Sequence, residues 1–303
     1  MSDEKIVWLN GEFVNESAAK VPILTHSLQY GSGVFEGIRC YKTPGGPAIF
    51  RLHDHIVRLF DSAKMYGMPL KFNINEVEEA ACNTVTKNRF ESAYIRPFVF
   101  YASIGIGYNV KGKSTSVAIA ALELGNLFGS KHKGLNCKIT TWNRINSSIL
   151  PAGAKASGNY LNSILASQEA VNSGYDEAIL ITDQGHIAEG PGENIFAVKD
   201  RVLITPPKST GILLGITRDT IIKIAESTGL GVEERDIRRE ELYTSDEVFF
   251  SGTAAEITPI LSVDSREIGN AMPGPITTLL SNRYSKIVSG KDKEFAEWLT
   301  PIS

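Results

Sequence analysis

A polar, glycine-rich stretch in the middle of the chain limits the possible folds more than any other feature. Between residues 123 and 136 the apolar periodicity of helices and strands lapses, and glycines recur among polar side chains. Boundaries between domains fall in segments of this composition. We therefore predict one domain over residues 1–124 and a second over residues 135–303, joined by an interdomain loop over residues 125–134. A length of 303 residues suits two domains of ordinary size.

The pattern before this loop predicts hairpins followed by helices. Asn10-Gly11 lies between two apolar runs and is typical of a two-residue type I′ turn. A strand over residues 34–41 is expected to be followed, after a turn, by a returning strand over residues 48–50. Apolar residues at helical spacing then predict a helix that ends at Gly67. A second helix is expected to open at Asn75 with Glu78 as its capping-box partner. Two further strands are predicted over residues 93–103 and 117–122.

Strands and helices alternate after the loop. Strands are predicted near residues 137–142, 178–182, 195–198 and 202–205, with helices over 159–172 and 217–228 and a last short strand over 248–250. The chain as a whole is therefore expected to be a mixed α/β (α+β) protein in two parts.

Composition excludes several classes of protein. With 42% hydrophobic and 21% charged residues the chain can bury a core, which excludes a disordered protein. A net charge of -3 offers no footprint for nucleic acid or an anionic membrane. The start lacks the pattern of a signal peptide, and no apolar run has the length of a spanning helix. We expect a cytoplasmic protein.

Three isolated cysteines, Cys40, Cys82 and Cys137, support neither a disulfide framework nor a zinc site. The run His53-Asp54-His55 has no third metal ligand nearby, and Asp54 is expected to cap a helix there. No metal site is predicted. The segment 31–37 does not match GxGxxG and precedes a strand, and no GxSxG motif occurs. A dinucleotide-binding domain and a serine hydrolase are therefore disfavoured.

Lys155 is the strongest candidate for a reactive group. Small residues on both sides of it let a bulky ligand approach the amine, and an apolar setting lowers the pKa of a lysine, which suits imine formation. Taken alone, a solvated surface lysine is the commoner interpretation. Tyr160 follows five residues later and either packs in the core or offers a phenol to a cofactor hydroxyl.

Two acids and an amide surround a Gly-Pro-Gly turn at Glu189, Glu193 and Asn194. They form either a tight connection with solvated acids or a buried carboxylate that needs a cationic partner, for which a protonated ring nitrogen would serve.

Three distant segments could bind an anion. Residues 215–218 open a helix, where backbone N–H groups and the hydroxyl of Thr217 form an anion site, although an ordinary threonine cap is the simpler interpretation. The turn over residues 251–255 is rich in small residues, and Arg58 offers a positive charge. Only the fold decides whether these segments converge.

Tyr94 and Arg96 lie two apart in a predicted strand and so share one face with Phe98 and Phe100. An arginine flanked by aromatic rings suits a pocket for an acid with an apolar tail, while an arginine paired to a surface carboxylate is the alternative.

Together these segments resemble the class IV (fold-type IV) pyridoxal-phosphate aminotransferases, and among them the branched-chain amino acid aminotransferases. The resemblance runs through residues 30–37, 58–64, 94–97, 155–160, 189–196, 215–219 and 251–257, in that order. It implies a small α/β N-terminal domain, a larger C-terminal domain with a β-barrel-like core, and a homodimer or higher homo-oligomer.

The resemblance also implies roles around pyridoxal 5'-phosphate. Lys155 would bind the cofactor covalently and later move a proton, and Glu189 would keep the ring nitrogen protonated. Tyr160 would bond the ring hydroxyl oxygen, and Leu213 would pack on a ring face. The phosphate would be bound by Arg58, Ile216, Thr217 and Thr253.

The implied reaction moves the amino group of L-leucine, L-isoleucine or L-valine to 2-oxoglutarate. Tyr94, Thr253 and Ala254 would hold the α-carboxylate and Arg96 the side-chain carboxylate of glutamate. The apolar part would be lined by Phe35, Gly37 and Tyr30, the last from a second subunit. Alternatives are a D-amino acid transaminase or an aminodeoxychorismate lyase, against which Tyr94-x-Arg96 argues, and a lysine-dependent aldolase or a small-ligand binding protein.

Overall fold

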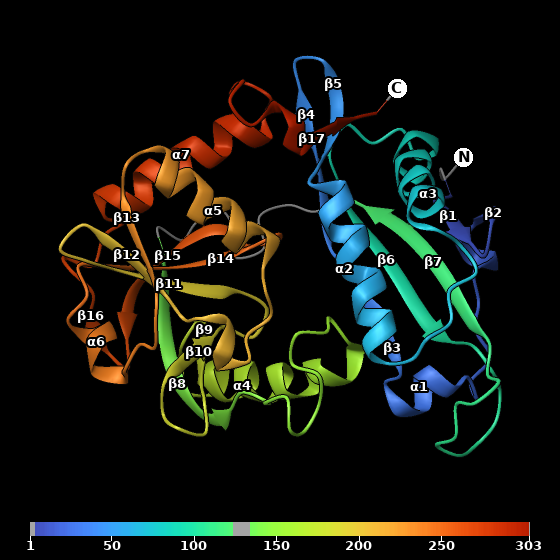
Figure 1. The fold of residues 1–303 in the computed structure, drawn as a ribbon, viewed down its shortest axis with the longest axis horizontal. Helices are drawn as coiled ribbons and strands as arrows, with labels where there is room; N and C mark the ends of the chain where they lie inside the picture. Colours follow the sequence, from blue (N-terminus) through green and yellow to red (C-terminus); the bar gives the residue numbers. More distant parts are fainter. Residues whose placement is uncertain (1–3, 124–133, 303) are drawn as a thin grey trace. The chain divides into compact units, whose positions relative to one another are not determined.

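The computed structural model describes residues 4–123 and 134–302, which belong to two compact units (Figure 1). The N-terminal unit comprises Met1–Leu124, Ala154–Gly158 and Ile287–Ser303. The barrel unit comprises Gly125–Gly153 and Asn159–Lys286. The predicted loop over residues 125–134 lies, except for its last residue, outside the described residues. The predicted domain limits therefore stay a prediction, to which the structure adds two later segments in the first unit.

The N-terminal unit is an eight-stranded sheet with helices, and its strand order is β17-β5-β4-β6-β7-β1-β2 with β3 also paired to β6. Its strands are β1 (Ile6–Leu9), β2 (Glu12–Asn15), β3 (Gly33–Phe35), β4 (Ile38–Thr43), β5 (Gly46–Phe50), β6 (Ala93–Tyr101), β7 (Thr115–Leu122) and β17 (Leu299–Pro301). Its helices are η1 (Glu16–Ala18), α1 (His26–Tyr30), α2 (Leu52–Met65), α3 (Ile74–Lys87) and η4 (Ala296–Trp298).

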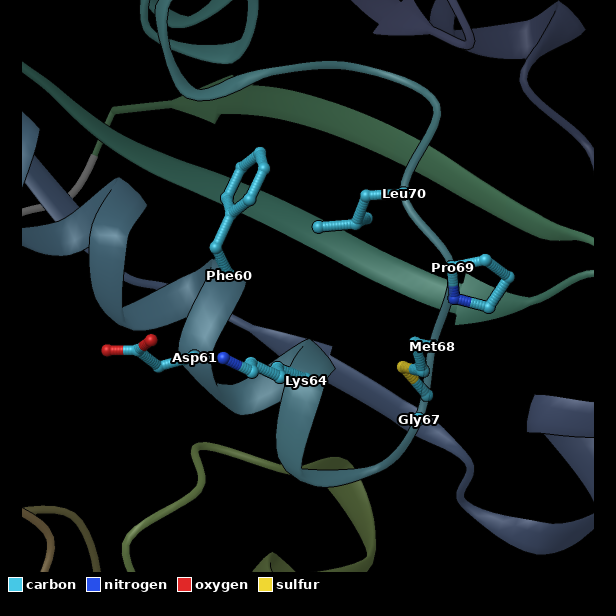
Figure 2. A pocket seen from close by; sticks show the side chains of 7 residues that line it. All are labelled: Phe60, Asp61, Lys64, Gly67, Met68, Pro69 and Leu70. Carbon is cyan, nitrogen blue, oxygen red and sulfur yellow. The ribbon is translucent and has the colours of Figure 1, made fainter.

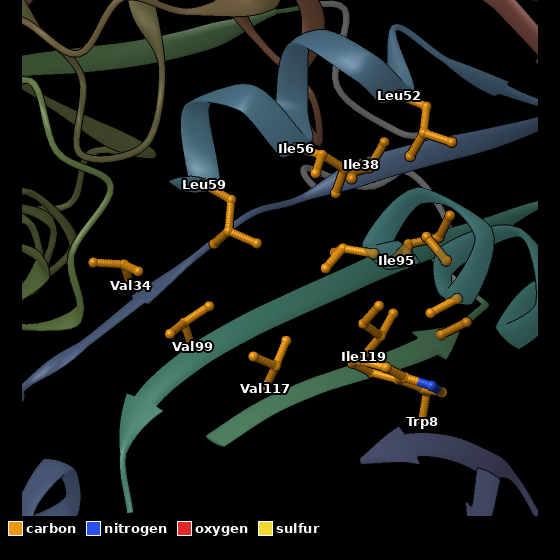
Figure 3. Packing of buried hydrophobic residues seen from close by; sticks show 14 of the residues in the cluster. Trp8, Val34, Ile38, Leu52, Ile56, Leu59, Ile95, Val99, Val117 and Ile119 are labelled. Atoms are coloured by element: carbon orange, nitrogen blue, oxygen red, sulfur yellow. The ribbon is translucent and has the colours of Figure 1, made fainter. Parts of the chain in front are cut away.

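The core of this unit lies where α2 and α3 pack on the sheet (Figure 3). Ile56 and Leu59 on α2 are fully buried, as are Ile95 on β6 and Ile119 on β7. These positions follow the helical and strand periodicities of the sequence, because each element must turn its apolar face inward.

Two predicted elements of this unit need correction. The strand expected over residues 34–41 is interrupted, since β3 and β4 pair separately with β6 on either side of Pro97. Proline has no N–H group with which to continue the ladder. Helix α3 also begins earlier than predicted, because Asn73 is its N-cap and forms the capping box with Glu76.

The barrel unit contains a closed β-barrel. Its strands are β8 (Leu135–Asn143), β9 (Glu177–Ile181), β10 (Ile187–Glu189), β11 (Asn194–Lys199), β12 (Val202–Thr205), β13 (Gly231–Glu234), β14 (Glu247–Gly252), β15 (Glu256–Val263) and β16 (Arg266–Glu267). Its helices are η2 (Ser157–Asn159, which begins in the N-terminal unit), α4 (Tyr160–Asn172), η3 (Lys208–Thr210), α5 (Ile216–Ser227), α6 (Arg239–Tyr243) and α7 (Pro275–Val288, which ends in the N-terminal unit).

Within the described residues, six strands pair in a ring, in the order β10, β9, β8, β15, β14, β11 and back to β10. This ring confirms the expected β-barrel-like core. The central strands are apolar along their length, as Phe196, Phe249 and Phe250 are fully buried. The prediction that residues 248–250 form the last strand is wrong, because β15, β16 and β17 follow. The sequence pattern did not predict β15, because the strand contains Pro259 and a proline normally argues against a strand.

Among residues 4–123 and 134–302, no helix combines the length and the hydropathy that crossing a membrane requires.

Candidate active site

Lys155 lies in the short segment of the N-terminal unit that runs beside β3. Its carbonyl accepts a hydrogen bond from the Phe35 N–H (3.0 Å), and its own N–H donates to Ser62 Oγ on α2 (3.0 Å). The ammonium lies 5.1 Å from the centre of the Phe35 ring. The neighbouring Ala154 and Ala156 are buried. The lysine is half-buried and fixed through its backbone, unlike the solvated surface lysine that was the alternative.

Tyr94 and Arg96 share one face of β6, as predicted from their spacing. Arg96 Nη2 donates to the Tyr94 hydroxyl oxygen at 3.3 Å, and its guanidinium lies 4.7 Å from the centre of the Phe35 ring. Gly37 leaves room for the Tyr94 hydroxyl, because a Cβ at this position would lie 1.9 Å from the Tyr94 oxygen. Phe35, Gly37, Tyr94, Arg96 and Lys155 therefore form one cluster within the N-terminal unit.

Arg58 is paired with a carboxylate that the sequence interpretation missed. Glu36 is fully buried, and its oxygens accept hydrogen bonds from Arg58 Nε (2.6 Å), Arg58 Nη2 (2.9 Å) and His55 Nδ1 (2.7 Å). Burial alone would raise the pKa of Glu36, but Arg58 and His55 hold it well below its usual range. Burial lowers the pKa of His55, against the opposing effect of Glu36. One local signal could have revealed Glu36, namely that it is a glutamate among the small and apolar residues 31–37.

Asp54 does not cap α2, contrary to expectation. The N-cap is Arg51, which has a left-handed backbone conformation, and Asp54 forms an ion pair with it from the first turn. In the part of the chain that the structure describes, no group of three potential ligands could hold a metal ion.

Tyr30 belongs to a different group in the N-terminal unit, around α1. Its hydroxyl accepts a hydrogen bond from the Gly107 N–H (3.2 Å), and its ring contacts His26 and Tyr108 with centroid distances of 4.7 and 5.3 Å. Tyr108 is 86% exposed. Tyr30 is thus placed beside an exposed aromatic residue.

Glu189 ends β10 and is buried within the barrel unit. Its carboxylate accepts hydrogen bonds from Arg144 Nε, from Asn194 Nδ2 (3.1 Å) and from the Leu213 N–H (3.2 Å). The predicted need for a cationic partner is therefore met, in this unit, by Arg144, which follows β8. Sequence reasoning missed Arg144, because nothing local connects it to a residue 45 positions away.

Helix α5 begins shortly after Leu213, whose N–H donates to this carboxylate. Its N-cap is Gly215, which has no side chain to cap the helix, so the interpretation of Thr217 as an ordinary cap is wrong. Thr217 is instead buried in the first turn. The N–H groups at a helix N-terminus carry a partial positive charge and favour anions.

The other predicted residues of this unit lie in the turn between β14 and β15 and at the start of α4. Thr253 and Ala254 form the turn between β14 and β15, and Gly252 in that hairpin lies beside Gly192, which precedes β11. Tyr160 is the first residue of α4 and is half-buried.

The barrel residues fit a bound polar, anionic ring compound. Arg144 Nη1 and Ser251 Oγ are buried and have no hydrogen-bond partner among the described residues. Arg144 also donates to Glu189 through Nε, and Ser251 lies opposite Asn194 in the β11–β14 ladder. Buried polar groups normally have partners, and pyridoxal phosphate carries a ring nitrogen, a hydroxyl and a phosphate that could provide them.

A separate surface pocket lies in the N-terminal unit (Figure 2). It is formed by α2 and the loop after it, with Phe60, Lys64, Met68 and Leu70 among its lining residues. None of the predicted site residues lines it, and we assign it no role.

A closed barrel with a buried carboxylate beside an uncapped helix N-terminus, in a chain that also fixes a half-buried lysine, agrees with the resemblance to the class IV aminotransferases. The chain belongs to this family, since the family model described as amino-transferase class IV matches residues 33–263. It is 45% identical over 300 residues to the branched-chain-amino-acid aminotransferase of Escherichia coli K12, covering 98% of this chain and 97% of that protein.

Solved structures agree with this assignment. A branched-chain aminotransferase from Thermoproteus uzoniensis, solved with norvaline, is 46% identical with a TM-score of 0.95, covering 99% of this chain and 100% of the other. The enzyme from Thermobaculum terrenum in its PLP form is 38% identical with a TM-score of 0.94, covering 100% of both chains.

Proposed function

We propose that this chain is a pyridoxal-phosphate-dependent aminotransferase that transfers the amino group of L-leucine, L-isoleucine or L-valine to 2-oxoglutarate. The observation that carries the proposal is the buried Glu189 carboxylate, held by three donors beside the uncapped N-terminus of α5. The relatives named above are branched-chain aminotransferases, and one of them was solved in its PLP form.

The residues of the barrel unit would bind the cofactor at its two ends. Glu189 would accept a hydrogen bond from the protonated ring nitrogen, and its negative charge would keep that nitrogen protonated. Ile216, Thr217 and Thr253 would donate to the phosphate. Leu213 would pack on a ring face, and Tyr160 would bond the ring hydroxyl oxygen. The bound cofactor supplies a ring that accepts the electron pair left when the Cα proton is removed.

The N-terminal unit would supply the reactive amine and the substrate contacts. Lys155 would bind the cofactor through its amine and then, once released, move the proton between the substrate Cα and the cofactor C4′. Arg58, oriented by Glu36, would bind the phosphate. Tyr94 would hold the α-carboxylate, together with Thr253 and Ala254 of the barrel unit.

One pocket must accept both an aliphatic side chain and the side-chain carboxylate of glutamate. Arg96 would bind that carboxylate, because its guanidinium is exposed and is held over the Phe35 ring. Phe35, Gly37 and Tyr30 would line the apolar part. The proximity of an apolar ring and a cation in one cluster supports the acceptance of both kinds of substrate.

We also propose that the chain is a homodimer in which Tyr30 reaches the site of the second subunit. Large apolar side chains are exposed around α1 and the loop that packs on it. Ile23 (78%), Leu28 (58%), Ile106 (84%) and Tyr108 (86%) are examples. A monomer rarely leaves such a patch in contact with water. Light scattering on protein eluting from a size-exclusion column should give a mass that is twice that of the chain or a multiple of that. A mass equal to that of one chain would exclude this arrangement.

A spectrophotometric screen tests the activity directly. The protein loaded with pyridoxal phosphate is mixed with one amino acid at a time, without a keto acid, and its cofactor absorbance is followed. We expect changes with L-leucine, L-isoleucine, L-valine and L-glutamate. A response to D-alanine without one to L-leucine would instead indicate a D-amino acid transaminase.

Borohydride reduction tests the assignment of the lysine. The reduced cofactor label should be recovered by peptide mapping on Lys155, and Lys155→Ala should abolish labelling. A label on another lysine would refute the assignment. Colourless protein with no spectral change on titration with pyridoxal phosphate would favour a binding protein or an aldolase.

A further inference from the structure

Asn194 occupies a central position in the barrel unit that the proposed reaction does not use. It is the first residue of β11, it is buried, and it lies directly opposite Glu189 in the β10–β11 pair. Its Nδ2 donates both to Glu189 Oε2 (3.1 Å) and to the Leu213 carbonyl oxygen (2.8 Å). Both protons of this amide are therefore used within the site.

The other end of the same amide lies against the helix N-terminus. A Cβ at Gly215, the N-cap of α5, would lie only 2.0 Å from Asn194 Oδ1. This close approach is possible only because residue 215 is a glycine. The Leu213 N–H also donates to Glu189 (3.2 Å), so the segment before α5 is tied to the carboxylate both directly and through Asn194.

We infer that Asn194 is a positioning residue that holds the ring-nitrogen acceptor, Glu189, in a fixed relation to the phosphate-binding turn of α5. This inference rests on the proposed use of both groups to bind one cofactor. The spacing between ring nitrogen and phosphate in pyridoxal phosphate is set by covalent bonds. A protein that fixes the matching spacing before binding loses less entropy when the cofactor binds.

Two variants test the inference. Asn194→Ala removes both hydrogen bonds. Asn194→Asp keeps the size of the side chain but turns an oxygen, in place of a donor, toward the Glu189 carboxylate and the Leu213 carbonyl. A hydrogen bond to a buried charged group changes an equilibrium by about tenfold to a hundredfold. We therefore expect the dissociation constant of pyridoxal phosphate to rise by at least about tenfold in each variant.

Magnetic resonance of the bound cofactor separates positioning from ordinary packing. The 15N signal of a labelled ring nitrogen reports its protonation, and the 31P signal reports the surroundings of the phosphate. Glu189→Gln should shift the 15N signal alone, and Thr217→Val the 31P signal alone. Both Asn194 variants should shift both signals, because the residue connects the two groups.

Asn136 provides a matched control in the same barrel. It lies on β8, and its side chain bonds with Asp176 and Ser262. Asn136→Ala should leave both signals unchanged. If Asn194→Ala does not fold, Asn194→Asp and Gly215→Ala, which presses on the amide from the helix side, give the same test.

The inference is overturned if the Asn194 variants keep both parent signals and lose only thermal stability, or if they shift only one signal. Parent protein that binds no pyridoxal phosphate would refute the proposed function itself. Parent binding with unmoved signals in the variants would refute the role of Asn194 alone.

Discussion

Replacing Glu36 with glutamine should destabilise the fold strongly, although the change removes only one charge. The carboxylate is fully buried and accepts hydrogen bonds from Arg58 Nε and Nη2 and from His55 Nδ1. A glutamine oxygen can replace one of its two acceptors, while the glutamine NH₂ group would face donors. The Arg58 side chain, only 15% exposed, would lose its counterion.

The size of the loss follows from this geometry. Breaking a buried ion pair on one side costs about 3–5 kcal/mol. Partial exposure of Arg58 and the one remaining acceptor reduce the loss for Glu36→Gln to the bottom of this range or below it, about 2–3 kcal/mol of unfolding free energy. Equilibrium unfolding of the full chain in urea at pH 7.5, at one protein concentration and followed by circular dichroism, measures this loss.

An exposed ion pair in the same unit gives the control. Glu91 and Lys42 lie 2.7 Å apart with side chains 70% and 66% exposed. Glu91→Gln makes the same chemical change and should cost about 0–1 kcal/mol. If the two variants lost equal stability, or if Glu36→Gln lost less than about 1 kcal/mol, the assignment of Glu36 as a buried counterion would be refuted.

Three further predictions concern other parts of the chain. Gly37→Ala should displace the Tyr94 hydroxyl and lower kcat/KM for L-leucine on the order of a hundredfold, measured by initial rates. Unchanged rates would show that the phenol moves without consequence. Glu247 accepts the first backbone N–H groups of α7, so Glu247→Gln should lower the unfolding free energy by about 1–2 kcal/mol in urea titrations. Burial lowers the folded pKa of His55, so below pH about 6.5 the unfolded chain binds more protons and the stability falls on acidification. His55→Asn should flatten the stability profile between pH 7.5 and 5, and an unchanged slope would contradict this.

Much of the fold could be predicted because it depends on local pattern. The Asn10-Gly11 turn and the helical stripe of α2 appear in the structure as expected. Errors arose where two patterns compete. Two overlapping Asn-x-x-Glu sequences start the second helix, and the structure uses the earlier one, Asn73 with Glu76. Pro259 hid β15 entirely, because a proline inside a strand normally argues against one.

The site shows the same division. Lys155, Glu189 and the turn before α5 could be proposed from the sequence because small residues, paired acids and a helix start are local signals. Glu36 and Arg144 were missed as partners, since an ion pair between residues 22 or 45 positions apart leaves no periodicity in the sequence.

The sequence by itself determined the family, because the family depends on the spacing and order of motifs, and it predicted the domain limits and the site residues. Only the tertiary structure decided which charges are buried and what satisfies them. Burying a charge is costly without a partner, and the partner comes from whichever strand the fold brings beside it. Glu189 pairs with Arg144 because β8, β9 and β10 are neighbours, and the Asn194 amide lies between Glu189 and α5 because the barrel closes at β10 and β11.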